Sequence, residues 1–380
     1  MDPHPSSFSR DAPVREYIDT TLTALLHQLS LPTADSHPAI SLKRRPSPAA
    51  CTINPSNRAL EGIPSVQVWT RHSSRKICNL VTDTPCLAVV IRVLSIIEQA
   101  MRTGKVISKR DIYYIDPEYF CSQTIVDGVI DDLAYTIGVD RAALHVEAAA
   151  KGLTVGCFRL RKHASSEVVD AHSVSTVGGI LIPRMEDVDD IDISGVRWVL
   201  VVEKDAVFQR LARSSYHLHA ASGEGILVTG KGYPDLCTRK FLRRLSDTAA
   251  PDLPFYALVD GDPDGVAIMS TYKYGSAAYA HNNFRLTISR LQWLGLRVTD
   301  AIAGVDSVED GVLLSLTARD RKKIVAMLRN SPVLARNGPE LGWRAELQCM
   351  LMLNIKAEIE ILYEQEKGLE GWIDQGMSRQ

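Results

Sequence analysis

The sequence has few cysteines and no long hydrophobic run. Its 380 residues include seven cysteines, and no two of them are spaced as Cys-x-x-Cys. This pattern argues against a disulfide framework and a cysteine-based zinc site, and it favours a reducing compartment. A membrane-spanning helix needs about 18 apolar residues in a row, whereas one of the longest runs here is Cys86–Ile91. The first residues also lack the apolar segment of a secretory signal.

The excess of charge of either sign is small. Lys plus Arg number 43 and Asp plus Glu number 45, so the net charge of −2 does not indicate a nucleic-acid partner. The distribution of charge is more informative, because residues 58–110 contain nine basic and three acidic residues. A local basic field suits a polyanion such as DNA, and a solvated charged surface is the alternative.

The length predicts two or three domains. Residues 1–57 are rich in Pro, Ser and His, and we expect a partly disordered arm there. One helical pattern interrupts this arm. Its apolar stripe is expected to dock either on a partner or on the chain's own domain. Lys43–Arg45 is either a nuclear signal or a solvated loop. The residues of the helical stripe are Val14, Ile18, Leu22, Leu25, Leu26 and Leu29.

Residues 58–175 have the pattern of three helices followed by two strands. The first helix is expected to stop at Gly104, and Ser108 and Ser122 are placed to cap the second and third. Residues 144–149 and 153–160 are predicted to be short strands. Three helices and a β-hairpin are the outline of a winged helix, a DNA-binding form.

Residues 190–380 alternate between strands and helices. Continuous apolar strands are expected at 198–202, 225–229 and 254–260, with helices after the first two, so a parallel sheet is predicted. Residues 351–367 are predicted to form a last long helix, either in the core or at a subunit interface. Its apolar stripe would be Leu351, Ile355, Ile359 and Leu362.

Three carboxylates follow strands of this predicted sheet. Glu203 ends the first strand, and Asp260 and Asp262 lie at the end of the third. In an open parallel sheet, ligands bind outside the carboxyl ends of the strands. Carboxylates that converge there repel one another unless a hard cation such as Mg²⁺ neutralises them. The alternative is an acidic surface turn.

A tyrosine pair lies in the predicted second helix, in the segment Lys109–Tyr114. Arg110 and Tyr114 are four residues apart and share one helix face. A tyrosine hydroxyl, with a pKa of about 10, is a poor nucleophile at neutral pH. A neighbouring guanidinium can favour the phenolate or hold a phosphate oxygen. Tyr113 points to another face, and a core aromatic pair is the alternative.

The combined motifs carry a family resemblance. The Glu…Asp-x-Asp pattern is similar to the Toprim signature of topoisomerases, primases and some nucleases. Over residues 60–380 the chain resembles the family of the A subunit of topoisomerase VI and its meiotic relative, sporulation protein eleven. The KRDIYY form and the N-terminal arm look more like the meiotic relative than the archaeal enzyme. The motifs, in order, are SKRDIYY, SQTIVDGVIDDLA, AAKGLTVG, VVEKDAVF, VTGKGYPDLCTRKFL and LVDGDPDG. The implied fold is a winged-helix (CAP-like) domain followed by an α/β Toprim domain.

The resemblance implies roles for individual residues. Tyr114 matches the family's nucleophile, and Arg110 matches an assisting arginine. Glu203, Asp260 and Asp262 match the ligands of Mg²⁺, the implied cofactor. The implied reaction is transesterification, in which the tyrosine attacks a DNA phosphate and becomes linked to the 5′ end.

DNA contacts and partners also follow from the resemblance. Lys151, Tyr233 and Lys273 are the implied DNA contacts, and Asp264 is a further carboxylate of open role. The implied assembly is a homodimer on double-stranded DNA, in which the tyrosine of one chain meets the metal of the other. The implied partners are accessory meiotic proteins and a topoisomerase VI B-like subunit. The implied location is the nucleus, on chromosomes, and no association with a membrane is implied.

Other functions remain open from the sequence. The chain is alternatively a topoisomerase VI A subunit that performs ATP-dependent strand passage with an ATPase partner. A DNA-binding scaffold without chemistry is a second alternative. A Toprim primase or nuclease would not need the Tyr114 hydroxyl.

Overall fold

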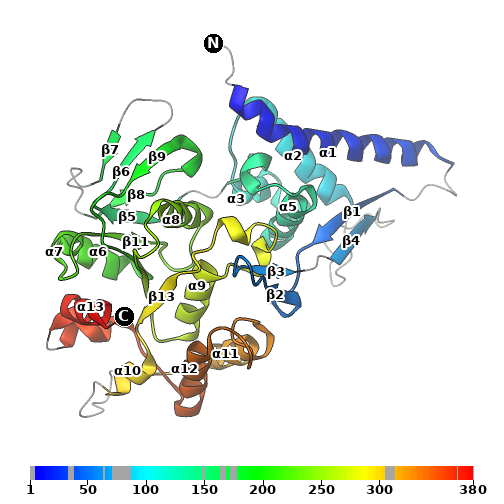
Figure 1. Ribbon diagram of the computed structural model, residues 1–380. Helices are drawn as coiled ribbons and strands as arrows, with labels where there is room; N and C mark the ends of the chain where they lie inside the picture. Colours follow the sequence, from blue (N-terminus) through cyan, green and yellow to red (C-terminus); the bar gives the residue numbers. More distant parts are fainter. Residues whose placement is uncertain are drawn as a thin grey trace. The chain divides into compact units, whose positions relative to one another are not determined.

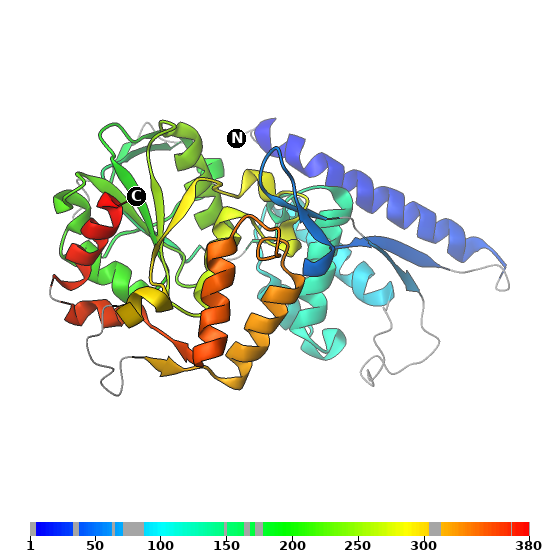
Figure 2. The same ribbon diagram turned by 60° about the horizontal axis from the view of Figure 1, so that its bottom comes forward.

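The computed structural model divides the chain into two compact units. The helical unit comprises residues 1–47, 62–149 and 277–282, and the sheet unit comprises the rest. Figures 1 and 2 show the elements of each unit. The structure describes residues 5–32, 38–62, 65–70, 87–147, 150–162, 168–171, 178–303, 313–365 and 367–379.

The helical unit is built around α2 and α5, whose apolar faces pack together (Figure 1). Ser108 caps α3 and Ser122 caps α5, as predicted. Gly104 follows α2 with a φ of 64°, a backbone conformation that favours glycine. The elements of this unit are α1 (Pro5–Ser30), β1 (Ala39–Arg44), β4 (Ser65–Thr70), α2 (Leu87–Thr103), α3 (Lys109–Ile115), α4 (Pro117–Phe120) and α5 (Gln123–Ile137).

The apolar stripe of the long helix α1 is only partly buried. Val14, Ile18 and Leu25 are buried in the core of the helical unit. The remaining leucines of the predicted stripe, Leu22 and Leu26 among them, are exposed. One edge of the predicted stripe therefore docks on the chain's own unit, and the other edge is exposed.

The hairpin predicted over residues 144–160 does not form. Val146 makes one isolated bridge, to Ile107, and the described residues around it form no strand. Strand β5 (Leu153–Gly156) instead pairs antiparallel with β11 (Gly225–Thr229). Its partner lies some seventy residues away, so tertiary pairing overrides the local hairpin pattern.

The sheet unit has a six-stranded sheet in the order β13-β12-β10-β11-β5-β8. Strands β10 (Trp198–Val202), β11, β12 (Phe255–Leu258) and β13 (Leu291–Gly295) are parallel, which confirms the predicted parallel sheet. Strands β5 and β8 (Ile180–Leu181) extend it antiparallel.

Helices cover this sheet (Figure 1). Trp198, Leu200 and Val202 pack in one cluster with apolar residues of α6 and α13. All residues of β10 are buried, as expected for a central strand covered on both faces. The covering helices are α6 (Asp205–Arg213), α8 (Leu236–Thr248), α9 (Pro263–Lys273) and α13 (Gly368–Ser378).

The prediction of one long helix over residues 351–367 is wrong. Helix α12 (Leu341–Leu353) ends at Asn354, which has a left-handed backbone conformation. Ile355 and Lys356 then form β15, which pairs with β14 (Leu314–Ser315), and Ile359–Glu364 forms a 3₁₀ helix. Ile359 and Leu362 are still buried in the sheet core, so their apolar character reflects burial without a helix.

Smaller elements complete the sheet unit. Strands β6, β7 and β9 form a three-stranded sheet. None of the helices in the described part of the chain is long and apolar enough to cross a membrane. The remaining elements are β2 (Cys51–Ile53), β3 (Leu60–Gly62), β6 (Arg159–Lys162), β7 (Val168–Asp170), β9 (Val188–Asp192), α7 (Tyr216–His219), α10 (Val298–Ala303) and α11 (Ala318–Asn330).

Candidate active site

Helix α3 presents Tyr114 to solvent. The Ser108 hydroxyl accepts the Asp111 backbone N–H at 3.0 Å, and the Asp111 carboxylate accepts the Ser108 N–H at 2.8 Å. This capping box starts the helix. The Tyr114 side chain is 66% exposed, whereas Tyr113 packs against the core of the helical unit. Arg110 is also exposed and lies about one turn before Tyr114.

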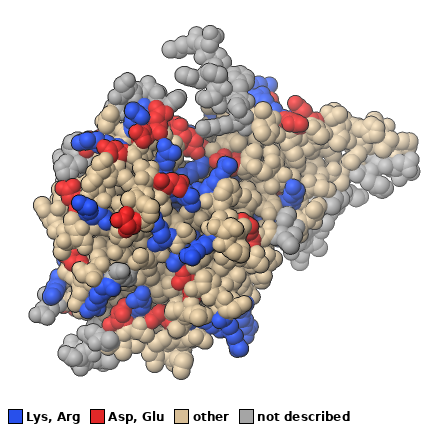
Figure 3. Space-filling view, in the orientation of Figure 1, with Lys and Arg blue, Asp and Glu red and all other residues tan. Residues whose placement is uncertain are grey.

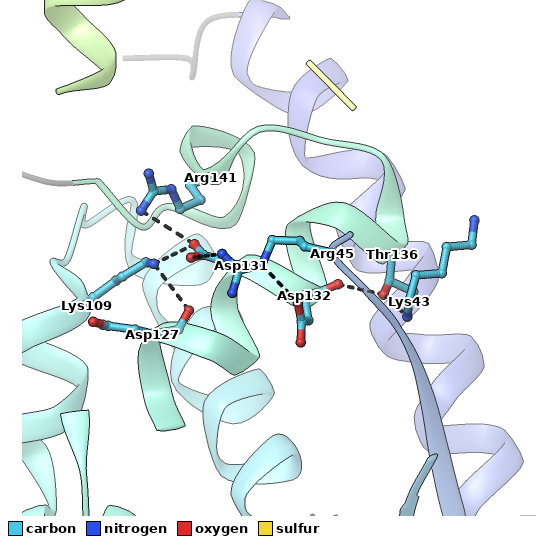
Figure 4. A network of polar contacts seen from close by, with 8 residues as sticks. All are labelled: Lys43, Arg45, Lys109, Asp127, Asp131, Asp132, Thr136 and Arg141. Atoms are coloured by element: carbon cyan, nitrogen blue, oxygen red, sulfur yellow. Dashed lines mark hydrogen bonds and ion pairs between the residues drawn. The ribbon is translucent and has the colours of Figure 1, made fainter. Parts of the chain in front are cut away.

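Charged groups anchor the start of α3 to α5 (Figure 4). The Lys109 ammonium lies 2.5 Å from the Asp131 carboxylate and donates to the Asp127 carbonyl at 3.2 Å. Asp131 also receives Arg45 at 2.8 Å and Arg141 at 3.5 Å. Three cations from separate segments therefore contact one carboxylate. We call this cluster of Lys109, Arg45, Arg141 and Asp131 the Asp131 hub.

The Asp131 hub changes how the basic stretch is interpreted. Lys109 was counted in the local basic field, but burial lowers the pKa of its ammonium and its charge is paired with Asp131. Arg102 pairs with Glu98 at 3.1 Å. Arg71, Arg75 and Lys76 lie outside the described residues. Lys109 at least therefore does not contribute a free charge to this field.

Replacing Asp131 by alanine is expected to destabilise the helical unit. Its loss would leave the mostly buried Lys109 and Arg141 cations without this carboxylate, while Arg45 keeps Asp132 at 3.1 Å. Removal of one partner from a buried ion pair costs about 3 kcal/mol or more. Chemical denaturation of the full chain measures the change. Glu98→Ala is the matched control, since it removes an exposed ion pair and should cost less than about 1 kcal/mol. Equal effects of the two substitutions would contradict the proposed role of the hub.

The sheet brings two of the predicted carboxylates together. Glu203 directly follows β10, and Asp260 lies two residues after β12, the parallel neighbour of β10. The Asp260 backbone N–H donates to Glu203 Oε2 at 3.0 Å. Both side chains are buried. Asp262 caps α9, where its Oδ1 accepts the Gly265 N–H at 2.7 Å.

Burial and mutual repulsion disfavour the ionised forms of these acids. Burial, followed by the charge of Asp260, raises the pKa of Glu203 to about 8. Burial raises the pKa of Asp260 to about 6, against the opposing charge of Lys204. Burial also raises the pKa of Asp262. The cluster therefore carries negative charge only at a cost in free energy that a bound cation would offset.

The chemistry of these side chains fits a hard divalent cation. All three offer carboxylate oxygens, the ligands that Mg²⁺ prefers. In the part of the chain that the structure describes, no three His, Cys, Asp or Glu side chains already stand as a metal site. Instead the Lys204 ammonium lies 3.2 Å from Asp260 Oδ2 and 2.6 Å from Glu360. Lys204, which the sequence analysis missed, thus supplies positive charge to the cluster.

The raised acid pKa values predict a pH dependence of the metal-free protein. A raised folded-state pKa gives stability that is fully present below the unfolded value and is lost as pH rises through the folded value. For Glu203 the window runs from about 4.5 to about 8. Denaturation in EDTA should therefore show a free energy of unfolding that falls across this range. The decline should be smaller in Glu203→Gln and unchanged in Asp205→Asn, and an equal decline in all three would contradict the assignment.

The predicted DNA contacts have different surroundings. The Lys151 ammonium donates to the Lys231 carbonyl at 3.1 Å. Tyr233, two residues after Lys231, is 45% exposed. The same loop approaches Glu203, whose carbonyl accepts the Gly232 N–H at 2.9 Å. Lys151 and Tyr233 therefore lie near the carboxyl end of the sheet, beside the acidic cluster.

Lys273 has another role in the structure. Its side chain is 17% exposed, and its ammonium pairs with Glu340 at 2.7 Å. It also lies over the ring of Trp343, 5.4 Å from the centroid. Because a DNA phosphate would have to displace these partners, the predicted DNA contact at Lys273 is not supported. A lone lysine in the sequence gives no sign of such a partner.

Comparison with known proteins identifies similar chains. Residues 198–369 match the family model of the Toprim domain of the topoisomerase 6 A subunit and Spo11, which confirms the Toprim prediction. Residues 86–146 match the model described as type IIB DNA topoisomerase.

Curated relatives extend the likeness over most of the chain. The meiotic recombination protein rec12 of Schizosaccharomyces pombe is 34% identical over 94% of this chain and 93% of its own. The meiotic recombination protein SPO11-1 of Arabidopsis thaliana is 38% identical over 72% of both chains. The human meiotic recombination protein SPO11 is 33% identical over 85% of this chain and 79% of its own.

Proposed function

Because the chain belongs to the family of Spo11 and the topoisomerase 6 A subunit, we propose that it is a DNA-cleaving transesterase that makes the double-strand breaks of meiotic recombination. The observation that carries this proposal is that one chain contains both an exposed tyrosine that can act as a nucleophile and a group of acids that can hold a metal ion. Tyr114 is exposed on a capped helix, and Glu203 and Asp260 form a buried acidic pair at a sheet edge.

The proposed reaction exchanges one phosphoester for another. The Tyr114 oxygen forms a bond to a backbone phosphorus, and the bond from phosphorus to the 3′ oxygen breaks. The phenol proton leaves, and the released 3′ oxygen takes up a proton to become a hydroxyl. The 5′ phosphate remains attached to Tyr114. Arg110, one turn earlier on α3, is proposed to hold a phosphate oxygen or the phenolate. Cleavage itself then needs neither water as nucleophile nor ATP.

A divalent metal ion, proposed to be Mg²⁺, would be held by Glu203, Asp260 and Asp262. When bound, it supplies charge stabilisation to the phosphate and leaving oxygens. We propose a homodimer on DNA in which the tyrosine of one chain meets the carboxylates of the other. Two such sites would cut the two strands.

The proposed DNA contacts combine the helical unit with the loop at Tyr233. Helices α2, α3 and α5 would form the helical part of a winged-helix (CAP-like) domain. Lys151 would approach a phosphate, and the Tyr233 ring would face the minor groove. On the face shown in Figure 3, basic side chains lie interspersed with acidic ones. We therefore expect local phosphate contacts, with affinity that falls as salt rises.

The exposed edge of the apolar stripe on α1 is the proposed site for a topoisomerase VI B-like subunit. Leu22, Leu26 and Leu29 are exposed on it, and Leu26 is 67% exposed. Residues 20–30 contain no Lys, Arg, Asp or Glu. An uncharged apolar helix face of this kind suits a protein partner. Accessory meiotic proteins and a nuclear, chromosomal location are part of the same proposal.

A covalent-capture experiment tests the proposed function. The full chain is incubated with Mg²⁺ and a duplex labelled at its 3′ ends, with and without a B-like partner, and is then denatured. The 3′ label stays on the fragment whose 5′ end is linked to protein, so a labelled protein band is expected. Absence of this band under both conditions would contradict the proposal. ATP-dependent strand passage would instead favour the alternative of a topoisomerase VI A subunit.

A further inference from the structure

Tyr233 is held by two charged residues from other segments of the sheet unit. Lys323 Nζ, on α11, lies 2.9 Å from the Tyr233 hydroxyl and also contacts Asp264 Oδ1. The Tyr233 hydroxyl lies 3.4 Å from the same Asp264 oxygen. The Lys323 ammonium is 5.4 Å from the centroid of the tyrosine ring. The three side chains form one closed cluster.

The side chains of this cluster are held in place by more contacts than those of an isolated surface ion pair. Lys323 is 23% exposed at its side chain and contacts both the hydroxyl and the ring of Tyr233. Its partner Asp264 is partly buried as well. Tyr233 itself remains 45% exposed. Its hydroxyl end is therefore fixed while part of the side chain stays open to a ligand.

The cluster also joins Tyr233 to the loop that carries a proposed metal ligand. Asp264 lies in the first turn of α9, two residues after Asp262, which caps that helix. Lys323 comes from α11, a helix that packs near α9. The position of the Tyr233 ring is thus tied to the acidic end of the sheet.

We propose that Lys323 and Asp264 are positioning residues that hold the Tyr233 ring for contact with DNA. The inference rests on the proposed DNA-binding function and deepens it. An aromatic ring that is held before binding loses less conformational freedom when DNA arrives, so affinity rises without a new contact. The same arrangement gives a role to Asp264, which the family resemblance leaves open.

The sign of the Asp264→Asn effect separates positioning from simple electrostatics. This substitution would remove a negative charge beside the proposed DNA path and release Lys323. Electrostatic attraction alone therefore predicts tighter DNA binding. Positioning predicts weaker binding, because Lys323 loses its ionic partner and the tyrosine loses its support.

The experiment measures the affinity of the full chain for a labelled duplex in Mg²⁺, in a Tyr114→Phe background that prevents cleavage. Lys323→Ala and Asp264→Asn are each expected to weaken binding about fivefold, with Lys323→Arg close to the parent. Lys322→Ala is the matched control, since Lys322 is an exposed neighbour on the same helix. Lys322→Ala removes one positive charge, as Lys323→Ala does, and therefore measures how much of the loss in DNA affinity comes from charge alone.

A double-mutant cycle shows whether Lys323 acts through the ring. In a Tyr233→Ala background, Lys323→Ala is expected to have no further effect beyond that of Lys322→Ala. Additive losses, or tighter binding by Asp264→Asn, would overturn the inference while leaving DNA binding intact. Failure of the parent chain to bind the duplex at low salt would overturn the proposed function and this inference with it.

Discussion

Replacing Tyr114 by phenylalanine is expected to abolish the covalent adduct with DNA, with a loss of at least about 10⁴-fold. The substitution removes one oxygen, which is the atom that would bond to phosphorus, and the other phenol of α3, Tyr113, packs against the helical core. Because Tyr114 is 66% exposed, its hydroxyl contributes little to packing. The measurement is the labelled protein band of the covalent-capture assay, together with the affinity for uncut duplex, which should be unchanged.

Tyr113→Phe is the matched control for this result. Its ring packs partly against the helical core, and its centroid is 5.3 Å from that of Tyr114. Loss of the Tyr113 hydroxyl should leave the adduct yield within about twofold. An adduct that persists in Tyr114→Phe, or that disappears only in Tyr113→Phe, would sink the assignment of the nucleophile.

Replacing Glu203 by glutamine, or Asp260 by asparagine, is expected to lower DNA cleavage by about 10³-fold. Each change removes a carboxylate that would hold the metal, whose charge stabilisation amounts to several kcal/mol. The rate of adduct formation should be measured across a Mg²⁺ titration. The variants should need more Mg²⁺ and should remain slow even at saturation.

Stability should move in the opposite direction. Burial raises the pKa of Glu203 to about 8 and that of Asp260 to about 6. Glutamine is neutral in both the folded and the unfolded chain, so Glu203→Gln avoids the free-energy cost of burying an acid, and the melting temperature of the metal-free variant at neutral pH should be equal to or above the parent value. The gain should be smaller for Asp260→Asn, which also removes an ionic partner of Lys204. Asp205→Asn is the control, because Asp205 is a more exposed neighbour paired with Lys231 at 3.1 Å. Normal cleavage by Glu203→Gln, or the same defect in Asp205→Asn, would contradict the proposed site.

Local elements of the fold could be predicted from short stretches of sequence. The strands at Trp198 and Gly225 are apolar runs whose hydrophobicity alone indicates burial on both faces. Ser108 and Ser122 could be recognised as caps because capping joins residues only two or three positions apart. Glu203 and Asp260 could be expected together because parallel strands end at one edge.

Elements that depend on distant partners could not be predicted in the same way. Leu153–Gly156 had strand character, but only the sheet decides that β11 is its neighbour. Ile359 and Leu362 have helical spacing, yet they are buried in a 3₁₀ segment after Asn354 has ended α12. An apolar pattern therefore predicts that a segment is buried more reliably than it predicts whether the segment is a helix, a strand or a turn.

By itself the sequence determined the chemical inventory of this protein. The strand-terminal carboxylates were recognisable from residue type and spacing, whereas the roles of Tyr114 and Arg110 followed from the family resemblance. Only the tertiary structure decided which charges are paired. Lys109 meets Asp131, 22 residues away, and Lys323 meets Asp264, 59 residues away. The sequence lists the ionisable side chains, but the pKa, the exposure and the availability to DNA of each one depend on partners that only the folded chain brings near.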